Sequence, residues 1–169
     1  FADTYISGAD WPTLIETLEK TGDVTAIAKA GQTPPDSPLE GIHARINAHF
    51  AGDSLTDVVN SLRAEDSDFA DDTLKSMARN SPLSMACTIE MIHRLRGPAA
   101  DIRRALDLEY RFTFRSMEQG DFLEGIRAAV IDKDRAPKWQ HGLDAPPSLA
   151  ATHMLMPLGQ DDLSFDKEG

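Results

Sequence analysis

The stretch ALDLEYRFTFRSMEQGDFLEGIRAAVIDKDRAPKW, residues 105–139, predicts two consecutive helices. In the first helix, apolar side chains four residues apart share one helical face. That face consists of Ile102, Leu106, Tyr110 and Phe114, with Leu108 and Phe112 widening it. Gly120 ends this helix, and Asp121 is placed to cap the next one, whose Phe122, Ile126, Ala129 and Val130 face one way. Packing of Tyr110, Phe112 and Phe114 against a neighbouring helix is favoured over a ligand slot. The apolar faces of residues 83–95 and 102–117 are broad enough that we also expect a partner surface outside the chain.

Helical periodicity extends over most of the remaining chain. An apolar stripe over residues 11–18 begins after Asp10 as a cap and ends near Gly22, and further apolar faces occupy residues 39–50, 55–62, 69–77 and 83–95. GQTPPDSP, residues 31–38, is a loop because adjacent prolines forbid a continued helix. The sequence therefore predicts an all-α fold of about eight helices, with strand at most in the opening FADTYI.

The charge of the chain narrows its possible partners. The 169 residues carry a formal charge of −11, which repels nucleic acids and anionic membranes. No apolar run reaches the roughly 18 residues that a membrane-spanning helix needs. Cys87 is the single cysteine, so it cannot form an internal disulfide, and its apolar helix face predicts an inert buried thiol. We expect no nucleic-acid partner and no membrane partner.

Catalytic and metal-binding motifs are missing from the sequence. There is no phosphate-binding glycine loop, no HExxH and no CxxC, and the five histidines are scattered. Glu90 and His93 share a helix face at the spacing used in di-metal bundles, but the further carboxylates of such a site are lacking, which favours a surface pair. The sequence predicts no metal site.

One cluster of cations stands out in this acidic chain. Lys133, Arg135 and Lys138 follow a predicted helix, with Trp139 next to them. One interpretation is a helix cap, because positive charge is favourable at the carbonyl end of a helix. The other is a ligand site, in which the cations contact phosphates and Trp139 stacks on a base. The pattern leaves both interpretations open.

The motifs NSPLSMACTIEMI and E-Y-R, then D-F-x-E-G-I-R-A and I-D-K-D-x-x-P-K-W, resemble the 3-hydroxyisobutyryl-CoA hydrolases. These are a branch of the enoyl-CoA hydratase/isomerase (crotonase) superfamily. The closing PLGQDDLSF is also similar to that family's tail, and the resemblance covers essentially the whole chain. It implies the helical C-terminal region of a crotonase-like fold, without the N-terminal β-domain that carries the oxyanion-hole amides and catalytic acids. No catalytic residue of the family can therefore be assigned in this segment.

The resemblance also implies an organisation. Residues 1–9 would leave the missing core, residues 10–80 would form smaller helices, residues 81–139 the long packing helices, and residues 140–169 a short helix and tail. The first residue is Phe1 rather than Met, so we expect a piece of a longer protein. The missing β-domain and further copies of the chain are the expected partners, in a homo-oligomer, and the chain alone should self-associate.

The function implied is that of a thioesterase of valine catabolism acting on 3-hydroxyisobutyryl-CoA or a similar short hydroxyacyl-CoA. A hydratase or isomerase of the same superfamily, or a non-catalytic helical interaction module, are the alternatives. Lys133, Lys138 and Trp139 would contact the CoA part of the substrate, no separate cofactor is expected, and this segment alone should be inactive. The expected location is cytoplasmic, or mitochondrial in a eukaryote.

Overall fold

A computed structural model describes residues 2–165 and confirms the all-α fold. Within these residues there are nine α-helices, and the only strand-like pairing is an isolated antiparallel bridge between Tyr5 and Gln32. The chain divides into two compact units, Phe1–Ile46 and Asn47–Gly169. The division falls inside the segment of smaller helices that was expected over residues 10–80.

The first unit contains α1 (Trp11–Thr21), α2 (Thr25–Lys29) and most of α3 (Pro38–His49). Helix α1 carries Pro12 in its first turn and, as predicted, ends at Gly22, whose left-handed φ of 64° suits glycine. Asp10 does not cap the helix; its carboxylate accepts a hydrogen bond from the Gln32 side chain at 2.6 Å. No residue of α1 is buried, so its apolar stripe, with Trp11 58% exposed, remains open within this unit.

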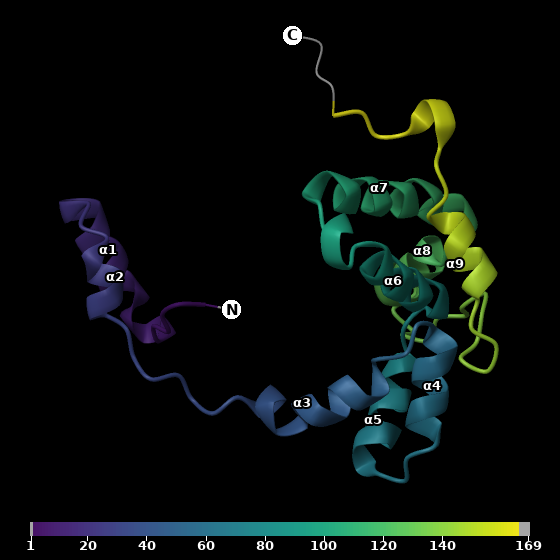
Figure 1. The fold of residues 1–169 in the computed structure, drawn as a ribbon, viewed down its shortest axis with the longest axis horizontal. Helices are drawn as coiled ribbons and strands as arrows, with labels where there is room; N and C mark the ends of the chain where they lie inside the picture. The colour runs from purple at the N-terminus through teal and green to yellow at the C-terminus, as the bar shows by residue number, and fades with distance from the viewer. Residues whose placement is uncertain (1, 166–169) are drawn as a thin grey trace. The chain divides into compact units, whose positions relative to one another are not determined.

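The core of the second unit is formed by α4 (Leu55–Arg63), α5 (Asp68–Met77), α6 (Pro82–Arg94) and α9 (Ser148–Met154). In Figure 1, α4 lies beside α5 and α6 lies beside α9, and both pairs are in contact. The buried side chains are mostly small or branched: Leu55, Val58, Val59, Leu62, Ala70, Met77, Leu83, Ala86, Cys87, Ala151 and Met154. Burial of their apolar surface is the main favourable term in holding these helices together.

Serine residues determine where the core helices begin. Ser54 and Asp57 form a reciprocal capping box at the start of α4. Ser67 accepts the backbone N–H of Ala70, and Ser81 accepts that of Ser84, at the starts of α5 and α6. Each serine satisfies a backbone donor that has no partner inside its own helix, which is why these starts could be predicted locally.

The long helix α7 (Ile102–Gln119) buries only one edge of its predicted apolar face. Leu108 and Ser116 are buried, whereas Ile102, Leu106, Tyr110 and Phe114 are 70, 41, 36 and 49% exposed. The prediction that Tyr110 and Phe114 pack against a neighbouring helix is therefore wrong within the described residues, whereas Phe112 packs against the core as predicted. An open apolar stripe is what a partner surface would require, and the partner itself stays a prediction.

Arg115 of α7 fixes the segment that follows α9. Its guanidinium donates hydrogen bonds to the carbonyl oxygens of Met154 at 3.0 Å, Met156 at 2.7 Å and Pro157 at 3.1 Å. A cation at this position complements the exposed carbonyls at the end of α9. None of the helices among the described residues is long and apolar enough to cross a membrane.

The position of the core predicts that replacing two leucines by alanine will have unequal effects on stability. Leu62 in α4 is 0% exposed, so Leu62→Ala should lower the free energy of unfolding by about 2–5 kcal/mol, because it leaves a cavity in the core. Leu149 in α9 is 89% exposed, and Leu149→Ala should change it by less than about 0.5 kcal/mol. Urea unfolding followed by circular dichroism measures both, and equal losses would contradict this placement of the core.

Candidate functional site

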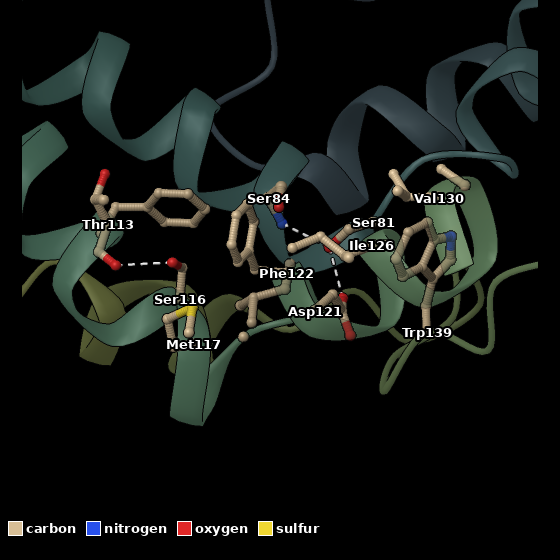
Figure 2. A pocket seen from close by; sticks show the side chains of 15 residues that line it. Ser81, Ser84, Thr113, Ser116, Met117, Asp121, Phe122, Ile126, Val130 and Trp139 are labelled. Carbon is tan, nitrogen blue, oxygen red and sulfur yellow. Dashed lines mark hydrogen bonds between the residues drawn. The ribbon is translucent and has the colours of Figure 1, made fainter. Parts of the chain in front are cut away.

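A cavity of about 510 Å³ lies between the start of α6, the second half of α7 and α8 (Phe122–Ile126). Figure 2 shows Ser116 and Thr113 at one end of the view and Trp139 at the other. Most of the wall is apolar, from Leu83, Phe112, Met117, Phe122, Ile126 and Val130. Such a cavity suits an apolar group or a small ligand with few polar atoms.

Asp121 is the buried carboxylate of this cavity, and both of its oxygens have partners. Oδ2 accepts a hydrogen bond from the Ser81 hydroxyl at 2.6 Å, and Oδ1 accepts one from the backbone N–H of Gln140 at 3.0 Å. Contrary to the prediction, its side chain does not cap α8. Asp121 instead joins the starts of α6 and α8 through Ser81 (Figure 2), and its other oxygen holds the chain that follows Trp139.

Trp139 forms one wall of the cavity and is half-buried. Its ring lies close to Gly125, where a Cβ would meet the ring carbons at 3.7–3.8 Å, an ordinary contact distance. The indole nitrogen is enclosed and has no hydrogen-bond partner among the described residues. Part of the ring is thus packed against α8, and only the remainder is open to a ligand.

The segment with the cations does not continue the helix. After α8 the chain makes a π-helical turn, Arg127–Ile131, closed by the bond from the Asp132 N–H to the Arg127 carbonyl at 2.8 Å. Lys133 and Arg135 then adopt left-handed backbone angles, with φ of 57° and 52°. Such angles cost a non-glycine residue roughly 1–2 kcal/mol, so surrounding contacts must hold them.

Those contacts converge on Arg127. Its guanidinium binds both oxygens of Glu124, at 2.9 and 2.7 Å, and one carboxylate oxygen each of Asp132 and Asp134 at 2.7 Å. Glu124 Oε1 also accepts the backbone N–H of Lys138 at 2.6 Å. We call Arg127 with Glu124, Asp132 and Asp134 the Arg127 network.

The Arg127 network alters the acidity of its members. Hydrogen bonds from Arg127, and then from the Lys138 N–H, lower the pKa of Glu124 to about 2. The Ala136 N–H and Arg127 lower the pKa of Asp134, and the three carboxylates, Glu124 foremost, raise the pKa of Arg127 itself. Glu124, Asp134 and Arg127 therefore stay charged across the neutral range.

Residues 132–138, which we call the cationic loop, carry Lys133, Arg135 and Lys138 exposed. Within residues 2–165 none of these three cations makes an ion pair, because the nearby acids are bound to Arg127. In this segment the side chains of Lys133 and Lys138 are exposed, while that of Trp139 lies against the cavity. Arg127 was not predicted as a site residue, although Glu124 three residues before it and the D-x-D after it were a usable signal.

The other candidates play no part in this site. Burial raises the pKa of the Cys87 thiol to about 12, as expected for an inert cysteine. Glu90 and His93 do not pair with each other: Glu90 binds Arg94 and the Thr152 hydroxyl, while His93 lies 3.4 Å from Asp53. Among the residues that the structure describes, no cluster of His, Cys, Asp or Glu is arranged to hold a metal ion.

Comparison with known proteins gives consistent matches. The family model described as Enoyl-CoA hydratase/isomerase matches residues 1–148. Two mitochondrial 3-hydroxyisobutyryl-CoA hydrolases are similar to this chain. The one from Bos taurus is 32% identical, and the match covers 79% of this chain and 35% of that protein. The one from Homo sapiens is 31% identical, and the match covers 75% of this chain and 33% of that protein. The chain thus spans about a third of these curated relatives.

Solved structures match over nearly the whole chain. An enoyl-CoA hydratase from Rhodobacter sphaeroides is 46% identical with a TM-score of 0.85, and the match covers 98% of this chain and 48% of that one. A carnitinyl-CoA dehydratase from Mycobacterium thermoresistibile is 28% identical with a TM-score of 0.83, over 99% and 48%. Both solved chains are about twice as long as the match.

The low pKa of Glu124 predicts a pH dependence of stability. Because the folded-state pKa of about 2 lies below the usual 4.5, the stabilisation by this carboxylate is complete above about pH 4.5 and is lost as the pH falls toward 2. Glu124→Gln should therefore lower the melting temperature at pH 7, and its difference from the unaltered protein should shrink between pH 4.5 and 2. Glu109→Gln, an exposed position on α7, is the control. A difference that stays constant down to pH 2.5 would contradict the assignment.

Proposed function

Because this chain belongs to the enoyl-CoA hydratase/isomerase family, as its motifs predicted, we propose that it is the helical part of an acyl-CoA thioester hydrolase. The proposed substrate is 3-hydroxyisobutyryl-CoA or a similar short hydroxyacyl-CoA, by similarity to relatives that carry that name. The whole enzyme would hydrolyse the thioester to the free acid and CoA.

The proposed division of labour assigns the chemistry to residues outside this chain. Thioester hydrolysis needs backbone N–H groups or similar donors aimed at the oxygen that becomes negative in the transition state. It also needs an acid or base that handles water. The buried carboxylate of the cavity is not free for the second task, since both oxygens of Asp121 are already bonded. We assign this chain to binding and packing, with other copies and a β-domain as its partners.

The observation that carries the proposal is the cationic loop beside an apolar cavity. CoA joins a strongly anionic phosphate end to a longer, largely uncharged arm. In a chain of net charge −11, phosphates are repelled unless cations gather locally and the nearby acids are neutralised. Lys133, Arg135 and Lys138 meet both conditions, because the Arg127 network binds the acids.

Trp139 connects the two parts of the proposed site. It follows Lys138 directly and forms the wall of the cavity, so a ligand bound by the cations would pass along its open portion. An aromatic ring at such a place can stack on a base or pack against an apolar arm. We propose that Lys133, Lys138 and Trp139 all contact the CoA part of the substrate, and that no separate cofactor is needed.

A hydratase is the second candidate, favoured by the 46% identity to the Rhodobacter sphaeroides protein of that name. The complete gene product decides between them when it is given 3-hydroxyisobutyryl-CoA with detection of free thiol, and crotonyl-CoA with detection of the lost enoyl absorbance. We expect rapid thiol release and little hydration. The 169-residue chain alone should release thiol no faster than buffer does. Hydration without thiol release would overturn the hydrolase proposal in favour of the hydratase.

The CoA contacts predict a separation of binding from chemistry. Lys133→Ala and Lys138→Ala in the complete protein should each raise KM for the CoA thioester up to about fivefold, since an exposed charge pair contributes up to about 1 kcal/mol. The kcat should hardly change, because these contacts bind the substrate and the transition state equally strongly. Trp139→Ala should also raise KM, and only the lysine effects should shrink with added salt.

Lys20→Ala is the matched control, because Lys20 is an exposed lysine on α1 that pairs with Glu16 and belongs neither to the cationic loop nor to the lining of the cavity. The helix-cap interpretation gives the opposite pattern, with lower melting temperatures and an unchanged KM. That pattern would refute the assignment of these residues to the CoA site.

A further inference from the structure

The cationic loop has a backbone that its own residues do not favour. Lys133 and Arg135 have no special tolerance for the left-handed region, yet both adopt it within three residues. Residues held in this way persist when their surroundings over-determine them, and they concentrate at functional sites. The question is which group holds the loop.

Arg127 is attached to the loop on both sides of each strained residue. Asp132 and Asp134, which flank Lys133, both accept hydrogen bonds from Arg127 Nη1 at 2.7 Å. The Ala136 carbonyl, after Arg135, accepts one from Nη2 at 3.2 Å. The far end of the loop is tied through Glu124, which bonds both Arg127 and the Lys138 N–H.

Acids and cations alternate along this loop. The acids Asp132 and Asp134 are bound to Arg127, while the cations Lys133 and Arg135 next to them are exposed and make no ion pair within residues 2–165. A flexible loop with the same composition could pair its own charges and present little net field. A planar guanidinium with five donors can hold several carboxylates at once, which a lysine ammonium cannot do in the same geometry.

We propose that Arg127 is a positioning residue that fixes the cationic loop for binding the phosphate groups of a CoA thioester. This inference rests on the proposed function of Lys133 and Lys138. Arg127 itself does not touch the ligand; it keeps Asp132 and Asp134 away from the phosphates and holds the loop in the strained form that leaves the cations unpaired.

A purely electrostatic role for Arg127 and a positioning role predict opposite changes in CoA affinity for one variant. The double variant Asp132→Asn/Asp134→Asn removes two negative charges next to the cations, so charge alone would make CoA bind more tightly. Positioning predicts weaker binding despite that gain in positive charge, because neutral amides hold the guanidinium less firmly. Arg127→Lys keeps the charge and loses the fork-shaped contacts, so it also separates the two roles.

The experiment measures the Kd of CoA by calorimetry with the complete protein, at low and high salt. We expect a rise of threefold or more for both variants, and a smaller rise in KM for a pantetheine thioester that lacks the nucleotide phosphates. Melting temperatures are recorded, and each Kd is measured well below the variant's own transition. Unchanged or tighter CoA binding by the folded double variant overturns the proposal, as does an unchanged Kd for Arg127→Lys.

The two proposals fail in different ways. If Lys133→Ala and Lys138→Ala leave the Kd of CoA unaltered, the CoA site itself is misplaced and the positioning role falls with it. If the lysine variants weaken CoA binding while the double variant and Arg127→Lys do not, only the role of Arg127 is wrong.

Discussion

The contact between Arg127 and its three carboxylates determines the shape of the segment that joins α8 to the cationic loop. One guanidinium takes Glu124, Asp132 and Asp134, and Glu124 in turn holds the Lys138 backbone. These bonds are charge-assisted, which makes each stronger than a neutral hydrogen bond. They compensate for two left-handed residues, and they place Trp139 against the cavity by fixing the chain just before it.

The same contact gives an acidic protein a local surface that suits the proposed anionic ligand. A net charge of −11 is unfavourable for phosphate groups at long range, but salt screens charges beyond about 8 Å at physiological ionic strength. The charges close to the site therefore decide whether a phosphate binds there. At the cationic loop the nearby carboxylates are already bound to Arg127. The cations Lys133, Arg135 and Lys138 remain available on the surface of the loop. A protein of this kind does not need a basic isoelectric point to bind a phosphorylated small molecule.

The second unit combines a small core with surfaces that stay open. Leu62, Leu83 and Met154 are fully enclosed among α4, α6 and α9, whereas the stripe of α7 from Ile102 to Phe114 is exposed. Exposed apolar stripes of this length commonly mark contacts with another protein surface. The longer relatives provide room for such a surface, since the chain spans only 48% of the solved chains that it matches.

The sequence by itself determined the helical periodicity, the end of α1 at Gly22 and the family. These depend on local spacing and short motifs, so they could be predicted without the fold. Tertiary structure decided which part of α7 is buried, because its predicted apolar face was broad and packing against α6, α8 and α9 buries only one edge of it. It also decided the roles of Asp10, Asp121 and Arg127. An acid before a helix can cap it or bind a distant partner, and Asp121 binds Ser81 and Gln140 because the fold brings these donors within 3.0 Å or less.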